Sequence, residues 1–110
     1  EINAGLSRRL DEWWGHVDLM VLPTVGVEPP AVNAFAHLDP AEHFKQSAAL
    51  GAFTAPFNIT GQPAASLPVG KTSSGLPIGI QIVARRGKDA LVLRLSRVLA
   101  DAGVWKAQSP

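Results

Sequence analysis

A short apolar run that contains no polar residue, Leu19 to Leu22, sets the strongest limit on how this chain can fold. A strand with one face in water alternates apolar and polar residues, so an unbroken run predicts a strand that is covered on both faces. Such a strand needs strands beside it, and the chain offers few. We therefore expect an α/β fold with a mixed central sheet flanked by helices, whose remaining strands lie outside these residues. Pro23 ends the run, and the proline-rich residues 23–33 predict an extended loop.

The start of the chain predicts a helix that Asn3 caps and Gly15 ends, because apolar residues recur there at helical spacing. The adjacent Trp13 and Trp14 would point about 100° apart on such a helix. We therefore expect one tryptophan to pack in the interior and the other to lie near a surface or a partner.

A second helix is predicted to begin at Asp39, with Pro40 at its first position and Glu42 completing a capping box. Pro56 is expected to end this helix. Its packing face is expected to consist of small and aromatic residues: Ala41, Phe44, Ala48, Ala49, Ala52 and Phe53.

Two strands, Ala64 to Leu67 and Ile78 to Val83, are predicted to pair antiparallel through a hairpin connection over residues 71–77. The residues before them, 57–63, predict a turn-rich segment. In the second strand, Gly79 lies on the face opposite the isoleucines. Its bare backbone there would let another segment approach closely.

The last helix is expected to begin at Asp89 as its cap and to end at Gly103. Arg97 and Asp101 are four residues apart on its wet side, where they can pair. The stripe that packs against the sheet is expected to be apolar: Leu91, Leu95, Val98, Leu99 and Ala102.

Composition limits the class of protein and its partners. The 110 residues are 46% hydrophobic and 17% charged, which predicts a globular chain of one domain. The net charge of +1 gives no case for nucleic acid or an anionic membrane, and the short cluster Arg85, Arg86 and Lys88 is expected to be a solvated loop. Without cysteine there is no thiolate chemistry, and no apolar run approaches the ~18 residues of a membrane-spanning helix. We predict a cytoplasmic protein, and the start at Glu1 instead of Met predicts a piece of a longer chain.

Few residues have the spacing that catalysis or metal binding requires. Lys71 beside Ser73 and Ser74 resembles a Ser/Lys pair, but this composition is typical of a solvated hairpin tip, which we prefer. The histidines lack metal-ligand spacing, so we expect surface or capping residues and predict no metal and no cofactor. They are His16, His37 and His43.

A polar stretch among apolar residues is the candidate binding surface. Asn58 and Thr60 follow Phe57 and precede an apolar strand. One interpretation is that both side chains bond their own backbone as Asx and ST turns. The other is a pocket wall, in which a few polar groups orient a ligand among apolar ones. We keep both interpretations, and Phe57, Asn58 and Thr60 are the candidates for a substrate pocket.

Three segments in order along the chain carry a family resemblance. The run FTAPFNITGQPAASLPVG from Phe53 to Gly70, followed by GLPIGIQIV from Gly75 to Val83, resembles the C-terminal end of amidase-signature enzymes. Upstream, DLMVLPT from Asp18 to Thr24 resembles the aspartate–apolar–Thr/Pro segment of that family. The NITGQPA core and Trp105 resemble amidases of the 6-aminohexanoate-cyclic-dimer hydrolase type.

The resemblance implies that residues 1–110 are the C-terminal fragment of a single amidase domain. It also implies hydrolysis of a carboxamide C–N bond by a Ser–cis-Ser–Lys triad, in which one serine attacks, the cis-serine relays the proton and the lysine is the base. The triad belongs to earlier parts of the family's sequence, so no catalytic residue is assigned here. The implied partners are a small-molecule amide and the rest of the domain, and a homodimer is considered. The fragment alone is expected to be inactive.

Two other interpretations stay open at this point. One is part of the A subunit of a Glu/Asp-tRNA amidotransferase, which would need partner chains. The other is a stand-alone small α/β binding module without enzyme ancestry, which would fold cooperatively as a monomer. The fragment interpretation instead predicts an exposed apolar sheet edge and face.

Overall fold

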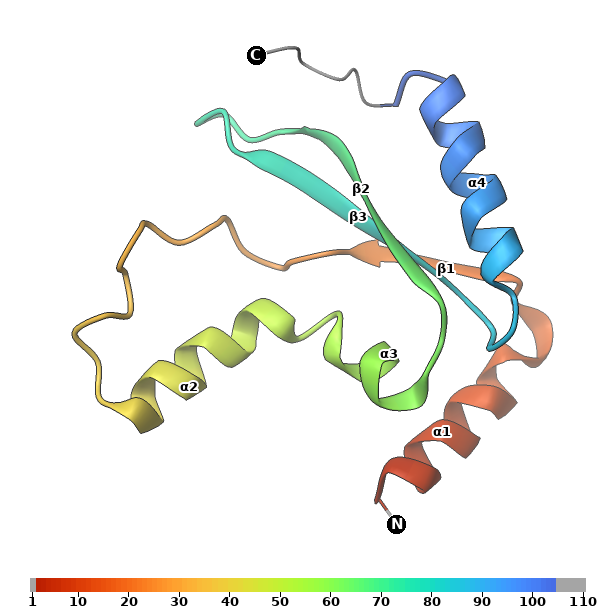
Figure 1. Ribbon diagram of the computed structural model, residues 1–110, viewed down its shortest axis with the longest axis horizontal. Helices are drawn as coiled ribbons and strands as arrows, with labels where there is room; N and C mark the ends of the chain where they lie inside the picture. Colours follow the sequence, from red (N-terminus) through yellow and green to blue (C-terminus); the bar gives the residue numbers. More distant parts are fainter. Residues whose placement is uncertain (1, 105–110) are drawn as a thin grey trace.

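The computed structural model describes residues 2–104, which form a three-stranded antiparallel sheet with helices packed on it (Figure 1). The fold is therefore α/β, as the sequence predicts. In chain order the elements are α1 (Ile2–Trp13), a 3-10 turn η1 (Trp14–His16), β1 (Leu19–Pro23), α2 (Pro40–Ala48), a second 3-10 turn η2 (Ala49–Gly51), α3 (Ala55–Thr60), β2 (Ala64–Lys71), β3 (Pro77–Ala84) and α4 (Asp89–Asp101).

The central strand of the sheet is β3, and the strand order is β1-β3-β2. The β2–β3 hairpin is confirmed, with β2 longer than predicted. Among the described residues, β1 has β3 as its single neighbour, so here it is an edge strand instead of an interior one. Val21 in the middle of β1 is 58% exposed, so the predicted cover on both faces is absent within residues 2–104. All the described pairs are antiparallel, so the parallel pairs of a mixed sheet are not among them.

One face of the sheet packs on α4. Ile82 and Ala84 of β3 and Leu67 of β2 are buried there against Val92. Leu91, Leu95 and Leu99 of the predicted stripe pack against this core, which confirms them. Val92, outside the predicted stripe, is buried, whereas the predicted Val98 is 61% exposed.

The ends of α4 differ in how well the sequence predicts them. Lys88 occupies the cap position and makes no side-chain capping bond, so the prediction that Asp89 caps the helix is wrong. Gly103, with φ 69°, closes the helix as expected. The Arg97 Nε donates to both carboxylate oxygens of Asp101 at 2.9 Å, which confirms that pair.

The opposite face of the sheet packs on α1, η1 and α3. Trp14 is fully buried against Phe57 and Val83. Trp13 is 51% exposed, which confirms that one tryptophan packs and the other does not. Asn3 lies inside α1, so its predicted capping role is wrong.

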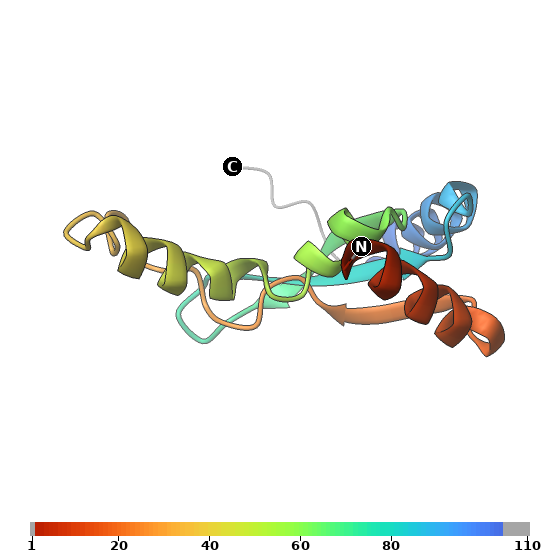
Figure 2. The ribbon, with the colours of Figure 1, turned by 90° about the horizontal axis from the view of Figure 1, so that it is seen from below.

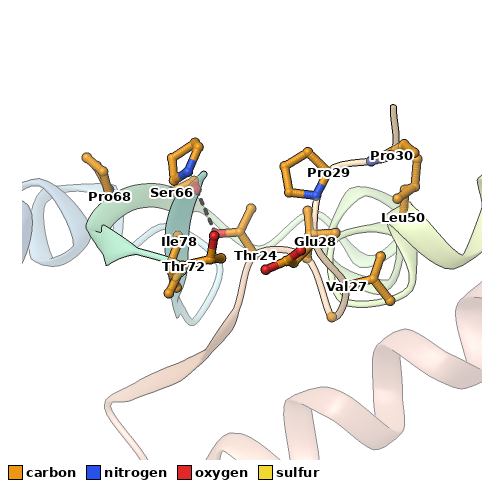
Figure 3. Close-up of a pocket in the computed structure, with 14 residues that line it drawn as sticks. Thr24, Val27, Glu28, Pro29, Pro30, Leu50, Ser66, Pro68, Thr72 and Ile78 are labelled. Carbon is orange, nitrogen blue, oxygen red and sulfur yellow. Dashed lines mark hydrogen bonds between the residues drawn. The ribbon is translucent and has the colours of Figure 1, made fainter. Parts of the chain in front are cut away.

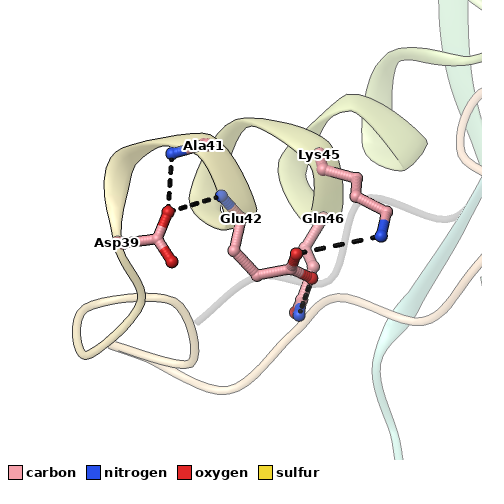
Figure 4. Close-up of polar contacts among 5 residues, drawn as sticks. All are labelled: Asp39, Ala41, Glu42, Lys45 and Gln46. Carbon is pink, nitrogen blue, oxygen red and sulfur yellow. Dashed lines mark hydrogen bonds and ion pairs between the residues drawn. The ribbon is translucent and has the colours of Figure 1, made fainter.

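Asp39 caps α2 as the sequence predicts, and Figure 4 shows its carboxylate at the start of the helix. Its Oδ1 accepts hydrogen bonds from the backbone amides of Ala41 and Glu42 at 3.0 and 3.1 Å. The predicted capping box does not form, because Glu42 accepts from Gln46 Nε2 at 2.8 Å and lies near Lys45. No residue of α2 is buried, and the residues of the predicted packing face that lie on α2, Ala41, Phe44 and Ala48, are exposed within residues 2–104.

The segment after α2 is more helical than predicted. Pro56 lies in the first turn of α3 instead of ending the preceding helix. Residues 57–60, predicted as turn, belong to α3, and Gly61 with φ 76° ends it. Proline suits a first helical turn as well as it suits the end of a helix, so the local sequence did not distinguish these cases.

The molecule is flat and open, with extents of 44 × 43 × 18 Å, and Figure 2 shows α2 projecting away from the sheet. The radius of gyration is 16.3 Å, whereas a compact chain of this length has about 13 Å. The accessible surface is 7803 Å², against about 5,800 Å² for a compact monomer of this mass. Large apolar residues are left exposed, such as Phe44 at 75%. The expected exposed apolar surface is confirmed.

Candidate functional site

A groove of about 630 Å³ opens where β1 ends. Its lining comes from residues 24–30 after β1, from Leu50 of η2, and from β2, β3 and the hairpin between them (Figure 3). These segments are far apart in sequence. The groove is therefore a product of the tertiary fold.

The loop after β1, residues 24–30, is held against the sheet at its first residue by a pair of hydroxyls. Thr24 Oγ1 and Ser66 Oγ lie 2.7 Å apart, and the Thr24 amide donates to the Gly79 carbonyl at 3.1 Å. A Cβ placed on Gly79 would lie 3.1 Å from Thr24 Oγ1. The close approach predicted at Gly79 is thus confirmed, and the approaching segment is the loop after β1.

Phe53 holds the loop at a second point, Gly26, two residues after Thr24. A Cβ on Gly26 would lie 2.6 Å from Phe53 Cε2, so the ring packs directly on that glycine. The Phe53 carbonyl in turn accepts a hydrogen bond from Nε2 of the buried Gln81 at 2.9 Å. The loop is therefore fixed at two points, and each is connected to β3. Thr24 bonds Gly79 directly, and Phe53, which packs on Gly26, bonds Gln81.

The groove has binding chemistry but no activated nucleophile. Its lining includes three hydroxyls, Thr24, Ser66 and Thr72, and one carboxylate, Glu28. None of the lining residues, all of them described, is a lysine or a histidine that could take a proton from these hydroxyls. A serine or threonine needs such a base to attack a carbonyl. The remaining lining is mainly valine, proline, leucine and isoleucine, which suits an apolar ligand.

The residues predicted for a pocket lie elsewhere. Phe57 is buried in the core with Trp14, and Asn58 is exposed on α3. Thr60 is buried, donates to the Pro56 carbonyl at 2.7 Å and contacts Gln62 Oε1. The local backbone bond expected for Thr60 is thus present, although inside a helix. The Asn58 side chain makes no hydrogen bond within residues 2–104, so its predicted Asx turn is absent. None of the three lines the groove. Their role as a pocket wall in a larger domain stays a prediction.

The remaining candidates are surface features. Ser73 and Ser74 are exposed at the hairpin tip, where Ser74 Oγ lies 2.8 Å from Thr72 Oγ1, as expected for a solvated turn. The three histidines are exposed, and no three potential metal ligands gather within residues 2–104. The basic cluster is an exposed loop, as predicted, in which Arg86 pairs with Asp11 and Arg85 with Asp18. None of the helices described has the length and hydrophobicity that crossing a bilayer requires.

Sequence reasoning did not assign Thr24, Glu28 or Ser66 to a site. Thr24 and Ser66 are 42 positions apart, and no local pattern indicates that they touch. Both lie in segments that carry the family resemblance, which was the one available signal.

Comparison with known proteins agrees with that resemblance. The Amidase family matches residues 1–93. The 6-aminohexanoate-cyclic-dimer hydrolase of Paenarthrobacter ureafaciens is 39% identical to this chain in an alignment 110 positions long, which covers 93% of this chain and 22% of that enzyme. The chain thus spans about a fifth of the length of such relatives and matches their C-terminal part. Trp105, quoted for the resemblance, lies outside the described residues.

Solved structures show the same relationship in three dimensions. A structure of 6-aminohexanoate cyclic dimer hydrolase superposes with a TM-score of 0.86 at 37% identity, covering 98% of this chain and 24% of that one. The A subunit of the glutamyl-tRNA(Gln) amidotransferase from Thermotoga maritima superposes less closely, with a TM-score of 0.73 at 30% identity. This match covers 89% of this chain and 20% of that subunit. Sequence and fold therefore agree that the chain belongs to the Amidase family.

Proposed function

We propose that residues 1–110 are the C-terminal part of a single amidase domain that hydrolyses a carboxamide C–N bond, with its catalytic residues outside this chain. The observation that carries the proposal is the similarity of nearly the whole chain to about a fifth of a 6-aminohexanoate-cyclic-dimer hydrolase. The open shape of the molecule supports it. The surface exceeds that of a compact monomer by roughly 2,000 Å², which is more than the ~800 Å² that each partner buries in a standard interface.

The proposed mechanism is that of the family. A serine attacks the amide carbonyl, a cis-serine relays its proton and a lysine acts as the base, after which water releases the acyl group. No metal or organic cofactor takes part. In this scheme the chain supplies strands of the common sheet, the covering helix α4 and a wall of the binding groove. Phe57, Asn58 and Thr60 are retained as proposed, untested contacts near the pocket.

The alternative functions are less well supported. The amidotransferase is the more distant of the two structural relatives described, and membership of such a complex would also require partner chains. The interpretation as a binding module without enzyme ancestry is wrong, because the chain belongs to the Amidase family. A cytoplasmic location and a homodimer stay predictions.

The test compares the isolated chain with the full-length protein that contains it. We expect the full-length protein to hydrolyse a carboxamide, with formation of the carboxylic acid and of the amine or ammonia. The isolated 110 residues should release neither. Hydrolysis by the isolated chain, or a full-length protein inactive on every carboxamide offered, would contradict the proposal.

A further inference from the structure

The groove contains one charged side chain, and that charge limits what the groove can bind. Glu28 is the sole charged residue among the fourteen that line it. In Figure 3 its side chain runs from the loop toward the side of the cavity where Thr24 and Thr72 lie. Within the described part of the chain, none of the ion pairs involves Glu28. Its carboxylate is therefore available for a cation from outside these residues.

The apolar residues around Glu28 favour a ligand in which a hydrocarbon chain adjoins the cationic group that the carboxylate would bind. Apolar surface from the loop, from η2 and from the strands borders the carboxylate, and such surface gains free energy when a methylene chain leaves water. The apolar residues in question include Val25, Val27, Pro29, Leu50, Pro68 and Ile78.

The backbone of the loop just before Glu28 is attached to the rest of the fold, and the Glu28 side chain is exposed to solvent. The loop that carries it is attached at Thr24, by the bonds to Ser66 and to the Gly79 carbonyl, and at Gly26, where Phe53 packs. Glu28 lies two residues beyond the second attachment. A carboxylate on an attached loop binds a complementary group with less loss of backbone freedom than a carboxylate on a free loop.

We infer that the groove holds the hydrocarbon chain of the amide substrate and that Glu28 binds an ammonium group at the far end of that chain. This inference rests on the proposed function and names its substrate class: aliphatic amides that carry an ω-ammonium group. Charge complementarity carries the choice, because a carboxylate in an apolar groove attracts an ammonium and repels an anionic end.

The experiment measures selectivity in the full-length amidase with two amides of the same chain length. These are 6-aminohexanamide, which is cationic at pH 7, and hexanamide, which is neutral. We expect the first to have the higher kcat/KM. Glu28→Gln keeps the shape of the side chain and should lower the ratio of the two kcat/KM values about fivefold, mainly through the KM of the cationic amide. Glu42→Gln removes a carboxylate on α2 that does not line the groove and should leave the ratio unchanged.

The outcomes separate this inference from the proposed function. If the full-length protein hydrolyses amides but Glu28→Gln leaves the ratio unchanged, the inference is overturned and the amidase proposal stands. If Glu28→Gln lowers both kcat/KM values equally and also lowers the melting temperature, Glu28 contacts protein from outside residues 1–110. That result also overturns the inference. If no carboxamide is hydrolysed, both proposals fail together.

Discussion

The hydroxyl of Thr24 lies 2.7 Å from the hydroxyl of Ser66, across the position in the central strand that Gly79 occupies. One residue follows β1, one belongs to β2, and the glycine between them belongs to β3. The contact therefore connects all three strands at the end of the sheet where the groove opens. The two hydroxyls can approach each other because Gly79 of β3 has no side chain between them.

We expect the hydroxyl pair to show measurable coupling. In the full-length protein, Thr24→Val and Ser66→Ala should each lower the free energy of unfolding by about 0.5–1 kcal/mol, since the bond lies near solvent. The double variant should lose less than the sum of the two, because either change alone breaks the same bond. Denaturant unfolding of the four proteins measures this coupling. Strict additivity, as expected for Thr24→Val combined with Ser47→Ala, whose hydroxyl bonds the Phe44 carbonyl within α2, would show that the two hydroxyls do not interact.

Gly79→Ala should destabilise the protein by about 1–2 kcal/mol, because the new methyl group would press on Thr24. Gly70→Ala in β2 is the matched control, since a Cβ there meets nothing within 4 Å. Thermal unfolding of both variants provides the comparison. Adding Thr24→Ala to Gly79→Ala removes the crowded oxygen and should recover part of the loss. Equal effects of the two glycine substitutions would argue against close packing at Gly79.

Loss of the α2 cap should loosen α2 locally. Asp39→Ala removes the acceptor for two backbone amides and should weaken the first turn by about 1 kcal/mol, whereas Asp39→Asn keeps an oxygen in place. Hydrogen exchange at the amides of Ala41 and Glu42 reports this turn directly. We expect faster exchange at these two amides in the alanine variant, and exchange close to wild type in the asparagine variant. Unchanged exchange in both variants would show that other contacts hold the helix start.

The isolated chain should associate or aggregate instead of folding as a compact monomer. Its accessible surface of 7803 Å² includes exposed apolar residues on the sheet and on α2 that water solvates poorly. Sedimentation velocity combined with a thermal melt followed by circular dichroism tests this expectation. A sharp unfolding transition of a monomer would contradict it, and with it the view that the chain completes its core with other sequence.

The elements that depend on short-range pattern were predictable. The β2–β3 hairpin follows from turn residues between two apolar runs, and the Asp39 cap follows from an acceptor placed just before a proline. The family resemblance was also predictable, because it depends on ordered segments that lie within the sequence. The role of Pro56 and the cap of α4 were predicted wrongly, since each depends on how a helix meets the rest of the fold.

By itself the sequence determined where most strands and helices lie and to which family the chain belongs, because hydrophobic period, capping residues and turn residues act over a few positions. The tertiary structure alone decided which strand lies in the centre, which side of α4 packs, and that Thr24, Glu28 and Ser66 border one groove. The physical reason is the range of the interactions. The contact between Thr24 and Ser66 spans 42 residues and depends on the glycine that β3 places beside them, which no local pattern encodes.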